Sequence, residues 1–309
     1  MYLSSVARIA VIGSINMDLV VRAPRFAQPG ETIAGDAFFT VSGGKGANQA
    51  VAARRLGGEV TLVGAVGDDA FGSAMAQGLA EEAIDVRHVD VRAGQASGVA
   101  LITVAATGEN TIVVVPGANA TLTADDVRRA REAIVSAAVL VLQFEIAIDV
   151  VQVAAAVAHA AGRLVVLNAA PAMPLPAALL PLVDYLVVNE TELLAVAGNG
   201  VRDHAAAVES LRARGAGAIV VTLGSAGVRL VDRDGTTTFL HAYTVDVVDT
   251  TAAGDAFVGA LAVALAEGLT PLEALRRGNA AGALAVTRAG AQPSLPTREQ
   301  LDSWLQAHV

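Results

Sequence analysis

The 309-residue chain contains no cysteine, which excludes disulfide bonds, thiol catalysis and cysteine-bound metals. Absence of cysteine also fits a reducing compartment, and we expect a cytoplasmic protein. Aromatic residues make up only 4% of the chain, so the core must be built mainly from Ala, Val and Leu. A chain of this length buries enough apolar surface to fold without a disulfide or a structural metal.

Long apolar runs and basic runs are also missing. Hydrophobic residues make up 54% and the mean hydropathy is +0.54, yet no uninterrupted apolar run reaches the roughly 18 residues that a membrane-spanning helix needs. The first apolar stretch is interrupted at once by Asn16 and Asp18, so it predicts a strand rather than a signal peptide. The net charge is −9 and no basic run exceeds two residues. We therefore expect neither membrane insertion nor nucleic-acid binding.

The chain instead alternates short apolar segments with helical ones. The apolar segments are rich in β-branched residues, as in parallel strands covered on both faces, and they span residues 9–12, 61–66, 139–143, 164–167, 185–188 and 218–222. Segments with helical periodicity lie between them, at residues 46–56, 71–83, 125–137, 150–160 and 203–214. This alternation predicts a doubly wound α/β fold, with a mostly parallel sheet and helices on both faces, in a single domain of residues 1–309.

Two regions break the alternation and predict a small β-sheet lid. Residues 19–41 have alternating strand character, and residues 98–115 have the pattern of a hairpin that turns near Gly108. Neither region has a helix to cover a sheet, so we place them together as a lid formed from about residues 17–41 and 97–115. Because small isolated sheets are marginally stable, the exposed face of the lid needs cover from substrate or from a second subunit.

The segment at residues 249–255, Asp-Thr-Thr-Ala-Ala-Gly-Asp, is the strongest candidate for chemistry. A helical run follows it over residues 256–266, and backbone amides at a helix start attract anions. Three small residues would let a phosphate approach those amides: Ala252, Ala253 and Gly254. Asp255 would then stand beside the phosphate as a proton acceptor, which suits phosphoryl transfer to a hydroxyl. The alternative is that Asp255 merely flanks a helix start.

Polar side chains elsewhere are candidates for binding a hydroxyl-rich ligand. A glycine-rich loop carries Lys45 and Asn48 but lacks the spacing of a P-loop, and taken alone it is more typical of a plain turn before a helix. Asn16 and Asp18 lie two residues apart after the first strand, so they would face the same way at the carboxyl end, where open α/β sheets bind ligands. A solvated loop is the alternative for this pair. Glu145 closes another buried strand.

Three further segments carry possible ligand contacts. Asn189 and Glu192 open a helix, where Asn189 would face nucleotide phosphates and Glu192 would hold water ligands of Mg²⁺; the alternative is an ordinary acidic helix start. Residues 222–227 form a glycine-rich link between two strands, which alone is an ordinary hairpin. Carbonyl groups of residues 288–294, with the carboxylate of Asp249, would be able to cage a monovalent cation beside the phosphate-binding turn.

Together these motifs resemble the ribokinase-like family of carbohydrate kinases. Residues 43–48 look like the N-terminal glycine signature of that family, and residues 249–255 look like its C-terminal signature with the catalytic aspartate. The match runs from residues 13–18 to residues 290–294, and several ordered motifs in one chain are more specific than any one of them. One departure is Asn279, which stands near the expected adenine site where the family often has histidine.

The resemblance implies ATP-dependent phosphorylation of D-ribose at its 5-hydroxyl, with Asp255 as base and the amides of the preceding turn stabilising the transferred group. It implies a ribose site formed by Asn16, Asp18, Gly44, Lys45, Asn48, Glu145 and Asp255. It implies an ATP site formed by Asn189, Thr222, Gly224, Gly227, Gly254 and Asn279. A monovalent cation site for K⁺ would map to Asp249, Thr251, Ala285, Arg288, Gly290 and Ser294, with Mg²⁺ held through water by Glu192.

The resemblance also implies a homodimer formed through the lid. Two alternatives stay open for the activity: a kinase for deoxyribose, another pentose or a nucleoside, and a sugar-binding module without catalysis. The intact pair of Gly254 and Asp255 argues against the second alternative. A carboxylate pKa of about 4 would make Asp255 a weak base, so we expect positioning and charge neutralisation to contribute more than proton removal.

Overall fold

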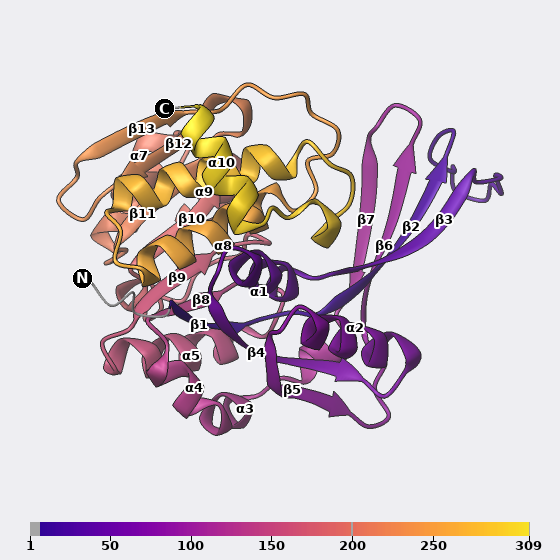
Figure 1. Ribbon diagram of the computed structural model, residues 1–309, viewed down its shortest axis with the longest axis horizontal. Coiled ribbons are helices and arrows are strands. Elements are labelled where there is room, and N and C mark those ends of the chain that lie inside the picture. The colour runs from indigo at the N-terminus through magenta and orange to yellow at the C-terminus, as the bar shows by residue number, and fades with distance from the viewer. Residues whose placement is uncertain (1–6, 199, 309) are drawn as a thin grey trace.

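The computed structural model describes residues 7–198 and 200–308, so both ends of the expected 1–309 domain lie outside the described residues. A nine-stranded sheet forms the body, in the order β13-β12-β11-β10-β9-β8-β1-β4-β5 (Figure 1). The parallel strands are β1 (Arg8–Ile12), β4 (Glu59–Gly67), β5 (Asp85–Arg92), β8 (Val139–Leu142), β9 (Leu164–Asn168), β10 (Tyr185–Asn189) and β11 (Ala218–Thr222). The antiparallel strands are β12 (Gly227–Val231) and β13 (Thr237–His241). The predicted doubly wound, mostly parallel sheet is confirmed.

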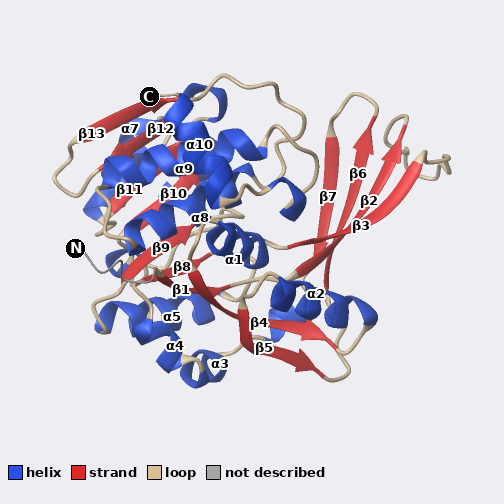
Figure 2. Cartoon of the chain, viewed as in Figure 1, coloured by secondary structure: helices blue, strands red, loops and turns tan. Residues whose placement is uncertain are grey.

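Helices cover both faces of this sheet (Figure 2). Strand β1 shows why: Ile9 and Val11 enter one apolar core while Ala10 and Ile12 enter the other, because successive side chains point to opposite faces. The first core is closed by α1 (Lys45–Arg55), α2 (Ala70–Glu81), α8 (Ala253–Ala266), α9 (Pro271–Ala285) and α10 (Arg298–Ala307). The second core is closed by α3 (Ala124–Arg129), α4 (Arg131–Ser136), α5 (Ile148–Ala160), α6 (Glu190–Ala197) and α7 (His204–Ala213).

One predicted helix is wrong in extent. The segment predicted as a single helix over residues 125–137 is divided into α3 and α4. The division falls at Ala130, whose backbone angles of φ −85° and ψ 6° leave the helical region. Among the described residues, no helix combines the length and the apolar character needed to cross a membrane.

The lid is a separate four-stranded sheet that stands to the right of the body in Figure 1. Its order is β3-β2-β6-β7, formed by β3 (Ala37–Gly43), β2 (Asn16–Ala23), β6 (Gly98–Ala105) and β7 (Asn110–Val115). Large apolar side chains remain exposed on it: Phe38, Phe39, Leu101, Ile112, Val113, Val114 and Val115. The lid therefore presents apolar surface that this chain alone does not cover.

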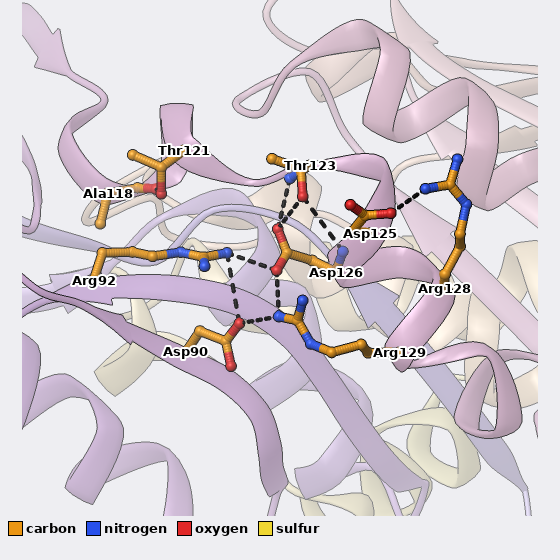
Figure 3. Close-up of polar contacts among 9 residues, drawn as sticks. All are labelled: Asp90, Arg92, Ala118, Thr121, Thr123, Asp125, Asp126, Arg128 and Arg129. Carbon is orange, nitrogen blue, oxygen red and sulfur yellow. Dashed lines mark hydrogen bonds and ion pairs between the residues drawn. The ribbon is translucent and has the colours of Figure 1, made fainter.

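An ion-pair network fastens edge strand β5 to α3 (Figure 3). The Asp126 side chain is 4% exposed, caps α3 by accepting hydrogen bonds from Thr123 N (2.7 Å) and Oγ1 (2.8 Å), and lies 2.7 Å from Arg92 Nη2. Arg129 pairs with Asp126 and also with Asp90. Burial alone would raise the pKa of Asp126, but Arg92, Thr123 and Arg129 outweigh burial and lower it.

Candidate active site

The start of the lid carries the first two sugar-site candidates. Asn16 and Asp18 lie two residues apart in β2, so they share a face, and both are buried. Neighbouring glycines permit this packing. A Cβ placed on Gly43 would lie 2.4 Å from Oδ2 of Asp18, and one on Gly44 would lie 2.7 Å from the backbone nitrogen of Asn16. Glycine at these two positions therefore lets the Asp18 carboxylate and the backbone at Asn16 pack directly against the chain.

Glu145, just after β8, gathers groups from distant parts of the chain. Its Oε2 accepts hydrogen bonds from Ser14 Oγ (2.5 Å), the backbone nitrogen of Lys45 (3.1 Å) and Asn16 Nδ2 (3.5 Å). The expected sugar ligands from the first strand, the glycine-rich loop and β8 are thus brought to one place. Sequence patterns predicted each of them separately.

Asn119 is a residue of this site that sequence reasoning did not assign. Its Nδ2 donates to Oδ1 of Asn16 at 2.8 Å and to the carbonyl of Ile15 at 3.1 Å, while its Oδ1 accepts from the nitrogen of Ile15 at 2.9 Å. A Cβ on Gly98 would lie 2.2 Å from Nδ2 of Asn119, so glycine is required there. The signal was the segment Pro-Gly-Ala-Asn at residues 116–119, whose role only the fold reveals.

Asp255, the expected base, is 6% exposed and both of its oxygens are held. Asn48 Nδ2 donates to Oδ2 at 3.0 Å, and Gln49 Nε2 donates to Oδ1 at 2.9 Å. Burial raises the pKa of Asp255, against the lowering effects of Lys45, Asn48 and Gln49. The expectation of an ordinary carboxylate pKa near 4 is therefore wrong, because it ignored burial. A raised pKa makes a carboxylate a stronger base, which suits the proton-accepting role expected of Asp255.

The charged groups around this site are the ammonium group of Lys45 and four carboxylates: Asp18, Glu145, Glu192 and Asp255. Burial alone would lower the pKa of Lys45, but the carboxylates of Asp255, Glu145 and Glu192 outweigh burial and raise it. Burial first, and then the charges of Glu145 and Asp255, raise the pKa of Asp18 to about 7. Such a site favours an uncharged ligand with several hydroxyl donors over an anionic ligand.

Helix α8 begins at Ala253, earlier than the predicted start at residue 256. The cause is Ala252, which takes left-handed backbone angles of φ 58° and ψ 10° and turns the chain directly into the helix. The amide of Ala253 donates to the carbonyl of Thr250 at 3.3 Å. A Cβ on Gly254 would meet nothing within 4 Å, so a ligand can approach this residue closely. Asp255 thus lies inside the first helical turn, beside amides that have no partner within the helix.

A pocket of about 770 Å³ opens beside this turn. All the residues expected at the ATP site line it: Asn189, Thr222, Gly224, Gly227, Gly254 and Asn279. Val247, Phe257 and Val286 add apolar walls, which suit a nucleotide base. Asn279 donates from Nδ2 to the carbonyl of His241 at 2.7 Å, which fixes its side chain at the pocket wall.

The side chains of Asn189 and Glu192 form a reciprocal cap on α6. Asn189 N donates to Glu192 Oε2 and Glu192 N donates to Asn189 Oδ1, each at 2.8 Å. These two residues therefore cap the start of the helix, as the alternative interpretation of the sequence expected. The role of Glu192 in holding Mg²⁺ stays a prediction. Across residues 7–198 and 200–308 no group of three or more acidic or histidine side chains is placed to hold a metal directly.

The two loops expected to hold a monovalent cation lie side by side. Asp249 Oδ1 accepts hydrogen bonds from Thr251 N (2.9 Å) and Oγ1 (2.6 Å), and its Oδ2 accepts from Gly290 N (2.8 Å). Those hydrogen bonds outweigh burial and lower the pKa of Asp249. The other expected members lie on the same stretch of chain: Ala285, whose carbonyl accepts from the nitrogen of Arg288, and Ser294, whose hydroxyl donates to the carbonyl of Ala291.

The sequence as a whole matches known proteins. Residues 6–298 match the family model described as pfkB family carbohydrate kinase. The chain belongs to this family. It is 40% identical to a ribokinase from Haemophilus influenzae, covering 96% of this chain and 98% of the relative, and 37% identical to a deoxyribokinase from Salmonella typhi, covering 96% and 98%. A structure of Arabidopsis thaliana ribokinase complexed with ribose and ATP superposes with a TM-score of 0.89 at 32% identity, covering 98% and 99%. The chain is therefore a carbohydrate kinase.

Proposed function

We propose that this kinase transfers the terminal phosphoryl group of ATP to the 5-hydroxyl of D-ribose. The position of Asp255 carries the proposal. Its carboxylate is bound to Asn48 of the polar sugar-side cluster, and the adjacent Gly254 lines the large pocket. The base therefore stands between a hydroxyl-binding site and a nucleotide-sized pocket. The ribokinase relative and the structure with ribose and ATP support ribose as acceptor and ATP as donor.

In this mechanism the sugar hydroxyls bind to the polar set Asn16, Asp18, Gly44, Lys45, Asn48 and Glu145. Asp255 accepts the proton of the attacking hydroxyl, while the amides of Ala252, Ala253 and Gly254 stabilise the transferred group. The amide of Ala253 would exchange its long hydrogen bond to Thr250 (3.3 Å) for one to that group. Phosphoryl transfer has a loose transition state, so alignment and charge neutralisation contribute most of the acceleration. Mg²⁺ would neutralise charge on the phosphates, with Glu192 contributing through water ligands.

Three further assignments belong to the same proposal. K⁺ would bind between the loops of Asp249 and Gly290, and activity in K⁺ would exceed activity in Na⁺ at matched ionic strength. Equal rates in both salts would contradict the cation site. Two copies would dimerise through the exposed apolar surface of the lid, where Ile112 and Val113 are 53% and 60% exposed. We place the enzyme in the cytoplasm, where ATP is available.

The deciding experiment measures ADP release over a panel of ribose, deoxyribose, fructose and nucleosides. Ribose should give the highest kcat/KM, and Asp255→Asn should lower kcat by at least about 10²–10⁴-fold on every sugar. The deoxyribokinase relative makes deoxyribose the second candidate. A preference for deoxyribose, a hexose or a nucleoside would refute ribose as the acceptor.

A further inference from the structure

A chain of buried amide side chains lies behind the proposed base. Gln49 and Gln143 are both 0% exposed, and neither was assigned a role from the sequence. Gln49 Nε2 donates to Oδ1 of Asp255 at 2.9 Å and to Oδ1 of Asn168 at 3.0 Å. Gln143 Nε2 donates to Oε1 of Gln49 at 2.7 Å. The amide of Gln49 therefore has both of its protons and its oxygen engaged.

This pattern fixes which way the Gln49 amide points. A flipped amide would place its oxygen against the carboxylate of Asp255 and its NH₂ group against the NH₂ group of Gln143, and both contacts would be repulsive. Gln143 has room in this position because residue 13 is glycine: a Cβ there would lie only 2.0 Å from Oε1 of Gln143, an oxygen with no hydrogen-bond partner among the described residues. Glycine at position 13 thus leaves space for the Gln143 amide, and the hydrogen bond from Gln143 orients the NH₂ group of Gln49 toward Asp255.

The backbone that carries this chain of amides is tightly packed. Gln49 lies on α1 and Asp255 on α8, and these helices approach so closely that a Cβ on Gly259 would lie 2.5 Å from Cβ of Ala52. Gln143 follows β8 and precedes the sugar-side Glu145 by two residues. Asp255 and the proposed sugar-binding residue Glu145 are therefore connected through the contacts of Gln49 and Gln143.

We propose that Gln49 and Gln143 are positioning residues for the phosphoryl transfer. Gln49 holds the carboxylate of Asp255 in the orientation that accepts the hydroxyl proton, and Gln143 locks the amide of Gln49. Because an amide is a neutral donor, it fixes the carboxylate without giving up a proton to it. This inference rests on the proposed role of Asp255 as the base.

The test compares Gln49→Met with the parent enzyme, because Met has a similar length but cannot donate a hydrogen bond. Misplacement of a reacting group by about 1 Å can cost about 100-fold in rate. We expect kcat to fall about 10–100-fold while the KM values for ribose and ATP stay within about twofold. A matched control is Asn119→Ala, another buried amide, which orients Asn16 and should raise the KM for ribose more than it lowers kcat.

A double-mutant cycle separates positioning from a merely structural role. In an Asp255→Asn background, Gln49→Met should cause little further loss of kcat, because the group on which it acts has already been neutralised. An equal loss in both backgrounds, or a parental kcat in folded Gln49→Met, would overturn the inference. If Gln49→Met does not fold by circular dichroism, Gln143→Met decides: kcat should fall with KM unchanged, and a parental kcat overturns the proposal.

The same measurements distinguish this inference from the proposed function. Full activity in Asp255→Asn would remove the base itself, and the proposed mechanism would fail. A strongly reduced kcat in Asp255→Asn together with a fully active Gln49→Met would leave the mechanism intact and reject only the positioning role.

Discussion

Gly43→Ala is expected to damage sugar binding through a single methyl group. Gly43 lies in strand β3 and does not have a positive φ angle, so alanine fits its backbone. The new Cβ would lie 2.4 Å from Oδ2 of Asp18, whereas ordinary van der Waals contact begins at 3.4 Å. The carboxylate must therefore move by about 1 Å, away from the position in which it would accept hydroxyl hydrogen bonds.

The size of the effect follows from the hydrogen bond that is lost. A hydrogen bond to a charged group contributes about 1.5–3 kcal/mol, and about 1.4 kcal/mol corresponds to a tenfold change in affinity. We expect the KM for ribose to rise about 10–100-fold and the KM for ATP to stay within about twofold. Initial rates of ADP release against ribose concentration measure the first value, and rates against ATP concentration measure the second.

Gly78→Ala is the matched control. Gly78 lies inside α2, and a Cβ there would meet nothing within 4 Å. This variant should keep both KM values and gain up to about 1 kcal/mol in the free energy of unfolding, because alanine favours a helix over glycine. A folded Gly43→Ala enzyme with a parental KM for ribose would refute the placement of Asp18 at the sugar.

Three further predictions concern stability and assembly. Burial raises the pKa of Asp18 to about 7, so the folded protein binds a proton that the unfolded chain lacks between about pH 4 and 7, and stability falls as the pH rises across this range and levels off above it. Asp18→Asn should therefore melt at a higher temperature than the parent at about pH 8, with the difference closing toward about pH 4; a constant difference would contradict the pKa. Asp126→Asn should lower the free energy of unfolding by about 3–5 kcal/mol in denaturant titrations near neutral pH. The difference should shrink gradually as the pH falls from about 4 toward the lowered pKa of Asp126. Asp125→Asn, whose side chain is 76% exposed, should change the free energy of unfolding by less than about 1 kcal/mol. Ile112→Lys should convert the proposed dimer to a monomer in analytical ultracentrifugation, and an unchanged dimer would contradict assembly through the lid.

The main sheet could be predicted because its central strands are short apolar runs, a pattern that burial on both faces imposes. Edge strand β5 (Asp85–Arg92) was not predicted. It alternates polar and apolar residues because an edge strand meets solvent, so it lacks the continuous apolar run of its neighbours. The division between α3 and α4 was missed because helical periodicity continues through Ala130 although its backbone angles do not.

Some residues of the candidate site could likewise be predicted from the sequence, and others could not. Asp255, Lys45 and the glycines stand in short motifs, where the need for small residues and charges is visible along the chain. The contact between Gln49 and Asp255 joins residues 206 positions apart, so no local pattern reports it. The raised pKa of Asp255 comes from burial between α1 and α8, which is a property of the folded protein.

The crossing of α1 and α8 also affects how the enzyme matures. During synthesis the proposed sugar-binding residues of the first quarter of the chain emerge long before α8, and pairing across such a distance is slow because loop closure must come first. Until α8 docks against the Ala52 face of α1, Asn48 and Gln49 have no carboxylate to hold. Catalytic activity should therefore recover late in refolding, after the N-terminal strands and the lid have already formed.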